Sequence, residues 1–434
     1  MGISAERSGD VDLFDLHRRD PARYPFLLQS VAGHPVSGRY DLLFAFPGEC
    51  IVGDRFFEQL AAQYERDRID ASADEAGLPF LGGWFLLLGY EATGQIEPKL
   101  KLPASPYRLP DALAVRCTAV AVHDRHRRTT RLYAEADPAQ LQALLDDLDA
   151  PASAPEPTPE IGPAIEQDPE LYRNGVRRVL DYLRAGDIFQ ANLSRHWRAP
   201  LLSGSAAGVY AKLRGANPAP FAGIAQWQGS SVISSSPERL LQIDRGIAET
   251  RPIAGTRPRG GNAVDDAELR DHLIGNVKER AEHVMLIDLE RNDLGRVCQP
   301  GSVEVSELMT VESYAHVHHI VSNIRGRLRA DASPADALRA VFPGGTITGC
   351  PKVRAMEILA ELEGVGRGPY TGAMGYLSRC GRLDTNILIR SFVVEDGQIS
   401  FRAGAGIVAD SDPDAELAET RAKARGLLLA LGAG

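Results

Sequence analysis

The sequence predicts an α+β fold in two parts, which a proline-rich segment separates. In the first part, strand-like runs at residues 40–46 and 82–90 precede a helical pattern at residues 138–148. In the second part, an amphipathic helical pattern at residues 168–183 is followed by a strand-like run at 187–197 and by further strands up to residue 250. Strands and helices therefore alternate without a repeated unit, which is typical of an α+β protein.

The proline-rich segment covers residues 151–167 and reads PASAPEPTPEIGPAIEQ. Proline lacks the backbone N–H that helices need, so this composition predicts an extended linker. We therefore expect an amino-terminal domain at residues 1–150 and a second, larger domain at residues 168–434. The second domain opens with Asp168-Pro169-Glu170, a helix-start signature, and carries two later helical patterns at residues 265–286 and 414–431.

Composition excludes several classes of function. The formal net charge is −10 and there are no long Lys or Arg runs, so we expect no nucleic-acid partner. The longest apolar stretch, at residues 84–90, is far shorter than the ~20 residues of a membrane helix, so we expect no membrane association. The five cysteines are scattered and form no CxxC pair, which favours a reducing, cytoplasmic location without disulfides or zinc.

Two pairs of glutamates are candidate metal ligands. Glu279 and Glu282 lie three residues apart in one helical pattern, and Glu416 and Glu419 repeat that spacing in another. Each pair therefore projects from one helix face. On the residues alone, a solvated helix face is the more common explanation of such spacing, and binding of a hard cation such as Mg²⁺ is the alternative.

Several ordered motifs together resemble the chorismate-utilising enzymes. They include SPERL at 236–240, PIAGTRPRG at 252–260, KERAEHVMLIDLERNDLGR at 278–296, FPGGTITGCPK at 342–352 and AGAGIVADSDPDAELAET at 403–420. The match is sharpest to the ammonia-using members, anthranilate synthase component I and aminodeoxychorismate synthase component I. The resemblance implies two packed antiparallel sheets flanked by helices, with an active site in a cleft of the second domain.

The resemblance also implies a substrate site for chorismate and a magnesium ion. Glu282 and Glu419 correspond to direct metal ligands and Glu279 and Glu416 to supporting ones, and the metal would hold the ring carboxylate. Arg390 matches the arginine that binds the enolpyruvyl carboxylate, although on the residues alone a surface ion pair is the more common explanation. Further positions that correspond to substrate-binding residues are Tyr370, Thr346, Thr256, Gly404, Gly406 and Lys423.

Glu238 in SPERL matches the family's general acid, which protonates the departing ring hydroxyl. Such a carboxyl must stay protonated near neutral pH, so we expect burial to raise its pKa. His319 corresponds to a histidine near the same hydroxyl. Gln190 stands where the relatives that add water to chorismate carry a lysine base, so it favours amination, because ammonia is already a nucleophile.

No cysteine lies in a GxCxG nucleophile elbow, so we expect the chain not to hydrolyse glutamine. Ammonia would then come from a separate glutamine amidotransferase subunit, component II.

Ala254 helps to distinguish between the two possible products of amination. Typical aminodeoxychorismate synthases carry a lysine there that attacks C2 of chorismate, so alanine favours anthranilate synthase. Against this, Gln29 replaces the glutamate of tryptophan-regulated enzymes, and residues 217–222 lack the tyrosine and methionine of their inhibitor pocket. These features favour aminodeoxychorismate synthesis for folate, through a noncovalent 2-amino-2-deoxyisochorismate. Anthranilate synthase is the alternative, and an inactive scaffold for the amidotransferase is a third, weaker one.

Overall fold

Two antiparallel sheets that meet at one long strand form the framework of the protein. The computed structural model describes residues 2–32, 38–73, 75–259, 262–313 and 317–432. The shared strand is β5 (Ala112–Asp124). Its first half pairs with β4 (Gly83–Leu88) and its second half with β6 (Thr129–Ala134), while β3 (Tyr40–Val52) runs along its other edge. The fold is therefore the α+β arrangement that the sequence predicts.

The first sheet runs from the amino-terminal strand to the longest strand of the second half. Each neighbouring pair is antiparallel, in the order β1 (Ile3–Ser8), β6, β5, β3, β2 (Phe26–Gln29), β10 (Phe221–Trp227), β11 (Ser230–Ser236), β20 (Ser391–Glu395), β21 (Gln398–Ile407) and β9 (Gln190–Ser203). The outer edge of β9 is covered by three two-residue strands, β7 (Glu160–Ile161), β8 (Ile165–Glu166) and β17 (Gly349–Cys350).

The second sheet continues from β5 in the other direction. Its order is β4, β18 (Ala373–Ser378), β19 (Leu383–Ile387), β12 (Arg239–Asp244), β13 (Ile247–Thr250) and β16 (Val317–Arg327). Strand β14 (Ile253–Pro258) follows β13 along the same edge of β16, and β15 (Glu304–Ser313) pairs with its opposite edge.

Aromatic side chains fill the space between the two sheets. Phe26 of the first sheet stacks on Phe85 of the second, with ring centroids 4.0 Å apart. Phe44 meets the same ring edge-on, and Phe80 packs edge-on against both Phe44 and Tyr376. Phe26, Phe44, Phe80 and Phe85 are all fully buried, so this layer supplies a large share of the apolar stabilisation of the fold.

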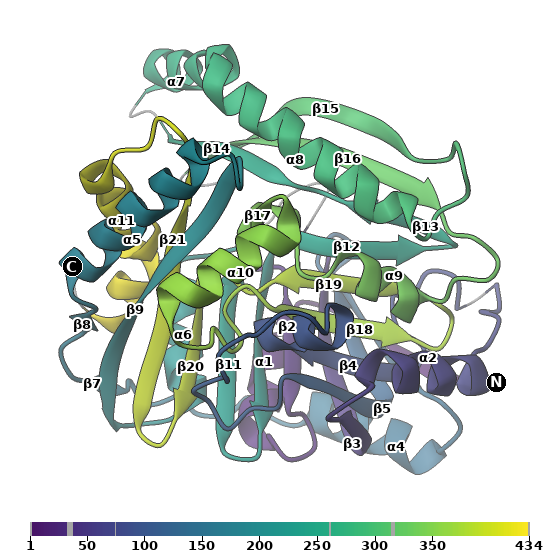
Figure 1. Ribbon diagram of the computed structural model, residues 1–434. Helices are drawn as coiled ribbons and strands as arrows, with labels where there is room; N and C mark the ends of the chain where they lie inside the picture. Colours follow the sequence, from purple (N-terminus) through teal and green to yellow (C-terminus); the bar gives the residue numbers. More distant parts are fainter. Residues whose placement is uncertain (1, 33–37, 74, 260–261, 314–316, 433–434) are drawn as a thin grey trace.

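Helices cover the outside of both sheets (Figure 1). Helix α11 (Pro413–Leu431) packs against α5 (Pro169–Arg184), α6 (Ala206–Ala216) and β21, and α10 (Lys352–Glu363) packs against β9. Helix α8 (Val277–Gly295) lies across β14 and β16, with α7 (Ala263–Gly275) before it. The remaining helices are α1 (Leu13–Arg19), α2 (Phe56–Asp67), η1 (Tyr90–Ala92), α3 (Thr93–Ile96), α4 (Pro138–Asp149), α9 (Pro334–Val341) and η2 (Gly345–Ile347).

One predicted helix is divided in the structure. The helical pattern at 265–286 becomes α7 and α8, which are separated at Asn276. The Asn276 side chain accepts a hydrogen bond from the backbone N–H of Glu279 at 3.2 Å, so it caps α8 at the point where Gly275 ends α7. The apolar spacing alone does not reveal this break.

Strands of the first 150 residues pair directly with strands of the second half, β2 with β10 and β4 with β18. The proline-rich segment 151–167 contains β7 and β8, which line the edge of β9. The division into domains at 1–150 and 168–434 remains a prediction. Within the described residues, no helix combines the length and the apolar character that crossing a membrane requires.

Candidate active site

Glu238 lies at the junction of β11 and β12 and is 5% exposed. Its carboxylate accepts a hydrogen bond from the backbone N–H of Ile253 at 3.3 Å. Burial raises the pKa of this carboxyl to about 7, and the Thr346 hydroxyl, the Ile253 amide and the charges of Lys423 and Arg390 oppose that rise. Glu238 therefore has the environment that a general acid near neutral pH requires.

Arg390 lies between β19 and β20 in a left-handed backbone conformation, with φ of 52°. Burial lowers the pKa of its guanidinium, while the neighbouring carboxyl of Glu238 raises it. Among the residues that the structure describes, none accepts a hydrogen bond from this guanidinium. A desolvated cation without a protein acceptor is suited to binding an anion such as a carboxylate.

The backbone of the PIAGT motif forms β14, which is paired with the strand that carries His319. Ala254 lies opposite Ile320, and Thr256 lies opposite His319. Burial, and then the charge of Arg390, lowers the pKa of His319 to about 4, so its imidazole is neutral at physiological pH. The side chain of Thr256 is outside the described part of the structure.

Gly255 brings the same motif against α8. It has φ of 65°, and a Cβ atom there would lie 2.5 Å from Oε2 of Glu279. The absence of a side chain at residue 255 therefore lets the Glu279 carboxylate reach the backbone of β14. Glu282 lies three residues further along α8 and is partly buried.

Gly404 and Gly406 of β21 make room for two other candidate residues. A Cβ atom at Gly406 would lie 2.3 Å from Nε2 of Gln190, and one at Gly404 would lie 2.8 Å from the Tyr370 hydroxyl oxygen. The resemblance implies that a substrate approaches the backbone closely at these glycines. In the structure, the space beside the two glycines is occupied by the side chains of Gln190 and Tyr370.

The carboxylates of α11 have protein partners. The Glu419 carboxylate pairs with Nζ of Lys423 at 2.8 Å, and the same ammonium donates to the backbone carbonyl of Gly404 at 3.1 Å. Glu416 accepts a hydrogen bond from the Ser411 hydroxyl at 2.5 Å. In the searched, described residues, no three His, Cys, Asp or Glu side chains gather closely enough to hold a metal ion. Carboxylate oxygens nevertheless suit a hard cation that keeps several waters.

The candidate residues therefore divide into connected groups. Electrostatic contacts join Glu238 to Arg390, Lys423 and Thr346, and join Arg390 to His319. Through Lys423 the first group continues to Glu419. Contacts across the glycines connect Gln190, Tyr370 and Glu279 to β21 or β14.

Two buried residues beside this site were not singled out from the sequence. Tyr172 of α5 is 3% exposed, and burial followed by the charges of Glu416 and Tyr370 raises its pKa. Glu290 of α8 accepts a hydrogen bond from the N–H of Gly345 at 3.3 Å, and burial raises its pKa to about 7. Tyr172 falls on the apolar face of its helix, so its spacing indicates only a core residue.

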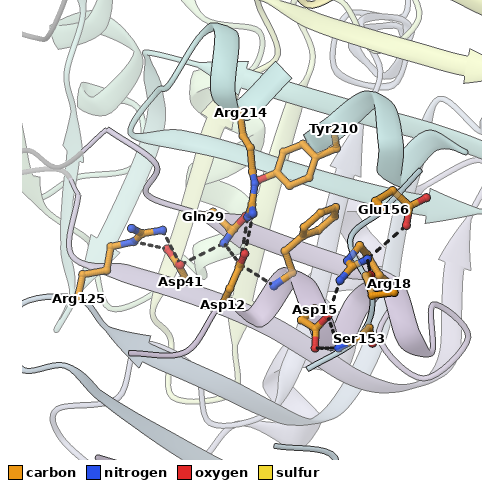
Figure 2. A network of polar contacts seen from close by, with 12 residues as sticks. Asp12, Asp15, Arg18, Gln29, Asp41, Arg125, Ser153, Glu156, Tyr210 and Arg214 are labelled. Atoms are coloured by element: carbon orange, nitrogen blue, oxygen red, sulfur yellow. Dashed lines mark hydrogen bonds and ion pairs between the residues drawn. The ribbon is translucent and has the colours of Figure 1, made fainter. Parts of the chain in front are cut away.

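A cavity of about 410 Å³ lies apart from all of these side chains, between the two sheets. Gln29 and Ser30 line it, together with Pro220, Phe221 and Ala222. Gln29 also belongs to a polar network, which Figure 2 shows. Its amide donates to Asp41 at 3.2 Å and accepts from the Tyr210 hydroxyl at 2.9 Å.

The chain is similar to known proteins over most of its length. The model of the chorismate binding enzyme family matches residues 34–429. The chain is 44% identical to the anthranilate synthase component I-like protein of Synechocystis sp., over 82% of this chain and 73% of that protein. It is 42% identical to anthranilate synthase component 1 of Thermus thermophilus, over 86% of this chain and 82% of that protein.

An aminodeoxychorismate synthase component 1, from Klebsiella aerogenes, is 41% identical over 95% of this chain and 96% of its own length. Among solved structures, anthranilate synthase component I from Streptococcus pneumoniae superposes with a TM-score of 0.80 at 30% identity, covering 91% of this chain and 93% of that one. The fold, the spaced motifs and these matches lead to one conclusion: the chain belongs to the family of chorismate-binding enzymes.

Proposed function

We propose that the protein aminates chorismate, using ammonia, at a site built around Glu238 and Arg390. The observation that carries this proposal is the pairing of a buried carboxyl whose pKa is about 7 with a desolvated guanidinium that no described residue engages. The guanidinium would bind the enolpyruvyl carboxylate, and the carboxyl would donate its proton to the departing C4 hydroxyl, which leaves as water.

Gln190 supports ammonia rather than water as the nucleophile. An amide cannot remove a proton from water, whereas neutral ammonia attacks without a base. Ammonia would add at C2 of the ring, lose its extra proton and give 2-amino-2-deoxyisochorismate. Ala254 has no amine that could form a bond to C2, so this intermediate would not be attached to the protein.

Magnesium would be held by the carboxylates of α8 and α11, with Glu282 and Glu419 as direct ligands and Glu279 and Glu416 in support. Two protein ligands leave positions for waters and for the ring carboxylate, in keeping with the coordination habits of Mg²⁺. The ion would supply positive charge to that carboxylate. Lys423, which already neutralises Glu419, would then be available to the substrate.

Ammonia would be supplied by a second subunit, a glutamine amidotransferase. The names of the Thermus thermophilus and Klebsiella aerogenes relatives, each a component 1, support this proposal. No cysteine of this chain lies in the nucleophile motif that glutamine hydrolysis needs.

Anthranilate is the first candidate for the product. Ala254 favours it, and so do the comparisons, because two of the three relatives described above and the Streptococcus pneumoniae structure are anthranilate synthase components or like one. In this route the bound intermediate loses pyruvate and becomes aromatic. The comparisons thus favour anthranilate, whereas the sequence features taken together favour aminodeoxychorismate.

Aminodeoxychorismate is the second candidate. The Klebsiella aerogenes relative matches almost end to end. In addition, Gln29 and Ala222 line the cavity, and the segments that contain them differ from the corresponding segments of tryptophan-regulated enzymes. In this route a second ammonia adds at C4 of the intermediate and expels the first from C2.

Incubation of the purified chain with chorismate, Mg²⁺ and a high concentration of ammonium at alkaline pH tests the proposal. Anthranilate with an equal amount of pyruvate would identify the first route. A product of aminodeoxychorismate mass that aminodeoxychorismate lyase converts to p-aminobenzoate would identify the second. Consumption of no chorismate would contradict amination altogether, and a covalent protein–chorismate adduct would contradict the free intermediate.

Dependence on the metal is tested in the same assay. Chelation with EDTA should abolish turnover, and Mg²⁺ should restore it. Glu419→Ala should need a higher Mg²⁺ concentration for half-maximal rate, whereas Glu361→Ala, an exposed glutamate on α10, should not. Equal magnesium dependence in both variants would contradict the proposed ligand.

A further inference from the structure

Arg367, in the loop between α10 and β18, uses all five of its N–H donors inside the protein. Nε and one Nη donate to the two carboxylate oxygens of Glu363, at 2.9 Å and 2.7 Å. The remaining hydrogens go to the backbone carbonyls of Asn192 at 2.7 Å and Ile347 at 3.3 Å, and to the Thr371 hydroxyl at 3.3 Å. The side chain is 2% exposed, so it cannot touch bulk solvent.

The three acceptors other than Glu363 belong to segments that carry candidate substrate residues. Ile347 follows Thr346, Thr371 follows Tyr370, and Asn192 lies two residues after Gln190 on β9. The guanidinium also lies over the Tyr370 ring, 5.7 Å from its centroid. One planar group therefore fixes the spacing of three segments that are far apart in the sequence.

Glu363 provides the negative charge that makes this burial tolerable. Its carboxylate also receives hydrogen bonds from Arg402 at 2.9 Å and from the Ser194 hydroxyl at 2.8 Å. Burial opposes the charged form of Glu363, but Arg367 and Arg402 hold its pKa below the ordinary value. A buried ion pair is weak evidence for stability alone, because desolvation offsets much of the attraction.

The amino-terminal part of the chain holds the backbone of the same loop. The Glu91 carboxylate accepts hydrogen bonds from the N–H groups of Arg367 at 2.6 Å and Gly368 at 2.9 Å. The ring of Tyr90 lies under the guanidinium, with its centroid 4.8 Å away. The loop is thereby fixed from both sides, by β9 and by η1.

We propose that Arg367 is a positioning residue, which sets the distance between the Thr346 segment and Tyr370 so that both face one substrate. It acts through its hydrogen bonds to the Ile347 carbonyl and the Thr371 hydroxyl, and it does not touch the substrate. The identity of that substrate rests on the proposed function. The arrangement of the segments around Arg367 does not depend on it.

The geometry of the guanidinium, rather than its charge, performs this role. A lysine ammonium has three donors at a single point and cannot reach the five acceptor positions that a planar fork reaches. Arg367→Lys therefore keeps the ion pair with Glu363 and releases the neighbouring segments. Arg402→Lys is a matched control, because Arg402 binds the same carboxylate and is 5% exposed, but its hydrogen bonds go to Glu363 and Ser194 and not to the segments of Thr346 and Tyr370.

The kinetic test compares Arg367→Lys with Arg402→Lys in ammonium-dependent turnover of chorismate. We expect Arg367→Lys to lower kcat/KM by about 100-fold, the order of loss that a displacement of about 1 Å causes. Arg402→Lys should lower it far less at a similar thermal midpoint. In the Tyr370→Phe background, Arg367→Lys should cost much less than it does alone, because the hydroxyl whose position Arg367 sets is already absent.

Hydrogen exchange separates this inference from the proposed function. Peptides that cover residues 345–349 and 368–373 should exchange faster in Arg367→Lys than in the wild-type protein, and should be unchanged in Arg402→Lys. An inactive wild-type chain with this exchange pattern would contradict the proposed function and leave the positioning role supported. Equal kinetics and equal exchange in the two lysine variants, or additive effects with Tyr370→Phe, would overturn the positioning role.

Discussion

At the residue scale, burial gives Glu238 and Arg390 opposite chemical characters. Burial keeps the proton on Glu238, whose pKa rises to about 7, and it leaves the Arg390 guanidinium short of acceptors. One group can then donate a proton while the other attracts an anion. The two effects have the same origin, because burial removes water from around both side chains.

The pH dependence of turnover should follow the proton of Glu238. Because the acid must be protonated and its pKa is about 7, we expect kcat to fall as pH rises through about 7, when rates are compared at constant free ammonia. Glu238→Gln should lower kcat by roughly 10²- to 10⁴-fold.

Glu290 is the control for this assignment, because burial raises its pKa to about 7 as well. Glu290→Gln should keep the decline above pH 7. Loss of that decline in Glu290→Gln would mean that Glu290, and not Glu238, is the titrating group.

Removal of the Arg390 charge should weaken chorismate binding without destabilising the fold. Arg390→Gln loses a charge-assisted contact to the substrate, so we expect about a 10- to 100-fold rise in KM. Since the wild-type charge is partly buried and has no described hydrogen-bond acceptor, the thermal midpoint should stay the same or rise. Calorimetric titration with chorismate checks the affinity, and a large fall in the midpoint would contradict this account of Arg390.

At the scale of elements, the pairing of β9 with β21 positions the amide of Gln190. The two strands are in register over ten residue pairs, with Gly406 opposite Asn192 and Gly404 opposite Ser194. Both glycines leave space that side chains from neighbouring segments occupy. The strand pairing thus controls the shape of the site as much as the residues within it do.

Substitution of Gly406 by alanine should displace Gln190 with little cost to the fold. The three atoms nearest to the new Cβ would all belong to the Gln190 side chain, which is flexible at its amide end. We expect kcat to fall while the free energy of unfolding changes by less than about 1 kcal/mol. Urea unfolding and steady-state kinetics measure the two quantities.

Gly215→Ala in α6 is the matched control, because no atom lies within 4 Å of a Cβ at that position. It should leave turnover unchanged and stabilise the protein by roughly 0.4–1 kcal/mol. Equal turnover in the two alanine variants would contradict a role for the space at Gly406.

Local pattern in the sequence predicted the elements well, and the reason is physical. The strand-like runs at 40–46 and 82–90 became β3 and β4, and the helical patterns at 138–148 and 168–183 became α4 and α5. Alternation and capping are local properties, so they are visible in the sequence. The pairing of β2 with β10, and the contacts of Arg367, join residues far apart in the chain, and no local pattern encodes them.

The candidate site was predictable only where the resemblance carried it. Glu238 lies in SPERL and Arg390 matches a position of the resembled family; burial raises the pKa of Glu238 and lowers that of Arg390, and the roles of both residues stay predictions. Tyr172 lies outside the motifs, and Glu290 lies inside the motif at 278–296 but was assigned no role there, because each fits the pattern of an ordinary helical residue. The magnesium ligands and the roles of the individual substrate residues stay predictions.

At the scale of the whole molecule, the two sheets share strands from both ends of the chain. Strand β10 lies between β2 and β11, and β18 lies between β4 and β19. Each has one neighbour from the first 150 residues. Removal of that part would expose one edge of β10 and one edge of β18, and it would take away the four phenylalanines that pack between the two sheets.

We therefore predict that residues 168–434 alone do not form a stable protein. The fragment should aggregate or lack a cooperative thermal transition, whereas the full chain should unfold in one transition. Calorimetry and light scattering check this, and co-expression with residues 1–167 should restore solubility. A monomeric fragment with its own sharp transition would contradict the prediction.

The order of the strands also has a consequence for biosynthesis. Strand β9 is complete at residue 203, yet its main partner β21 is made only at residues 398–407. A nascent chain on the ribosome therefore carries a fourteen-residue strand with an open edge for almost two hundred residues of further synthesis. The short strands β7 and β8, which precede β9 and pair along its other edge, are available from the start. The proline-rich segment can therefore pair with part of one edge of β9 before β21 is made, while the edge that β21 occupies stays open.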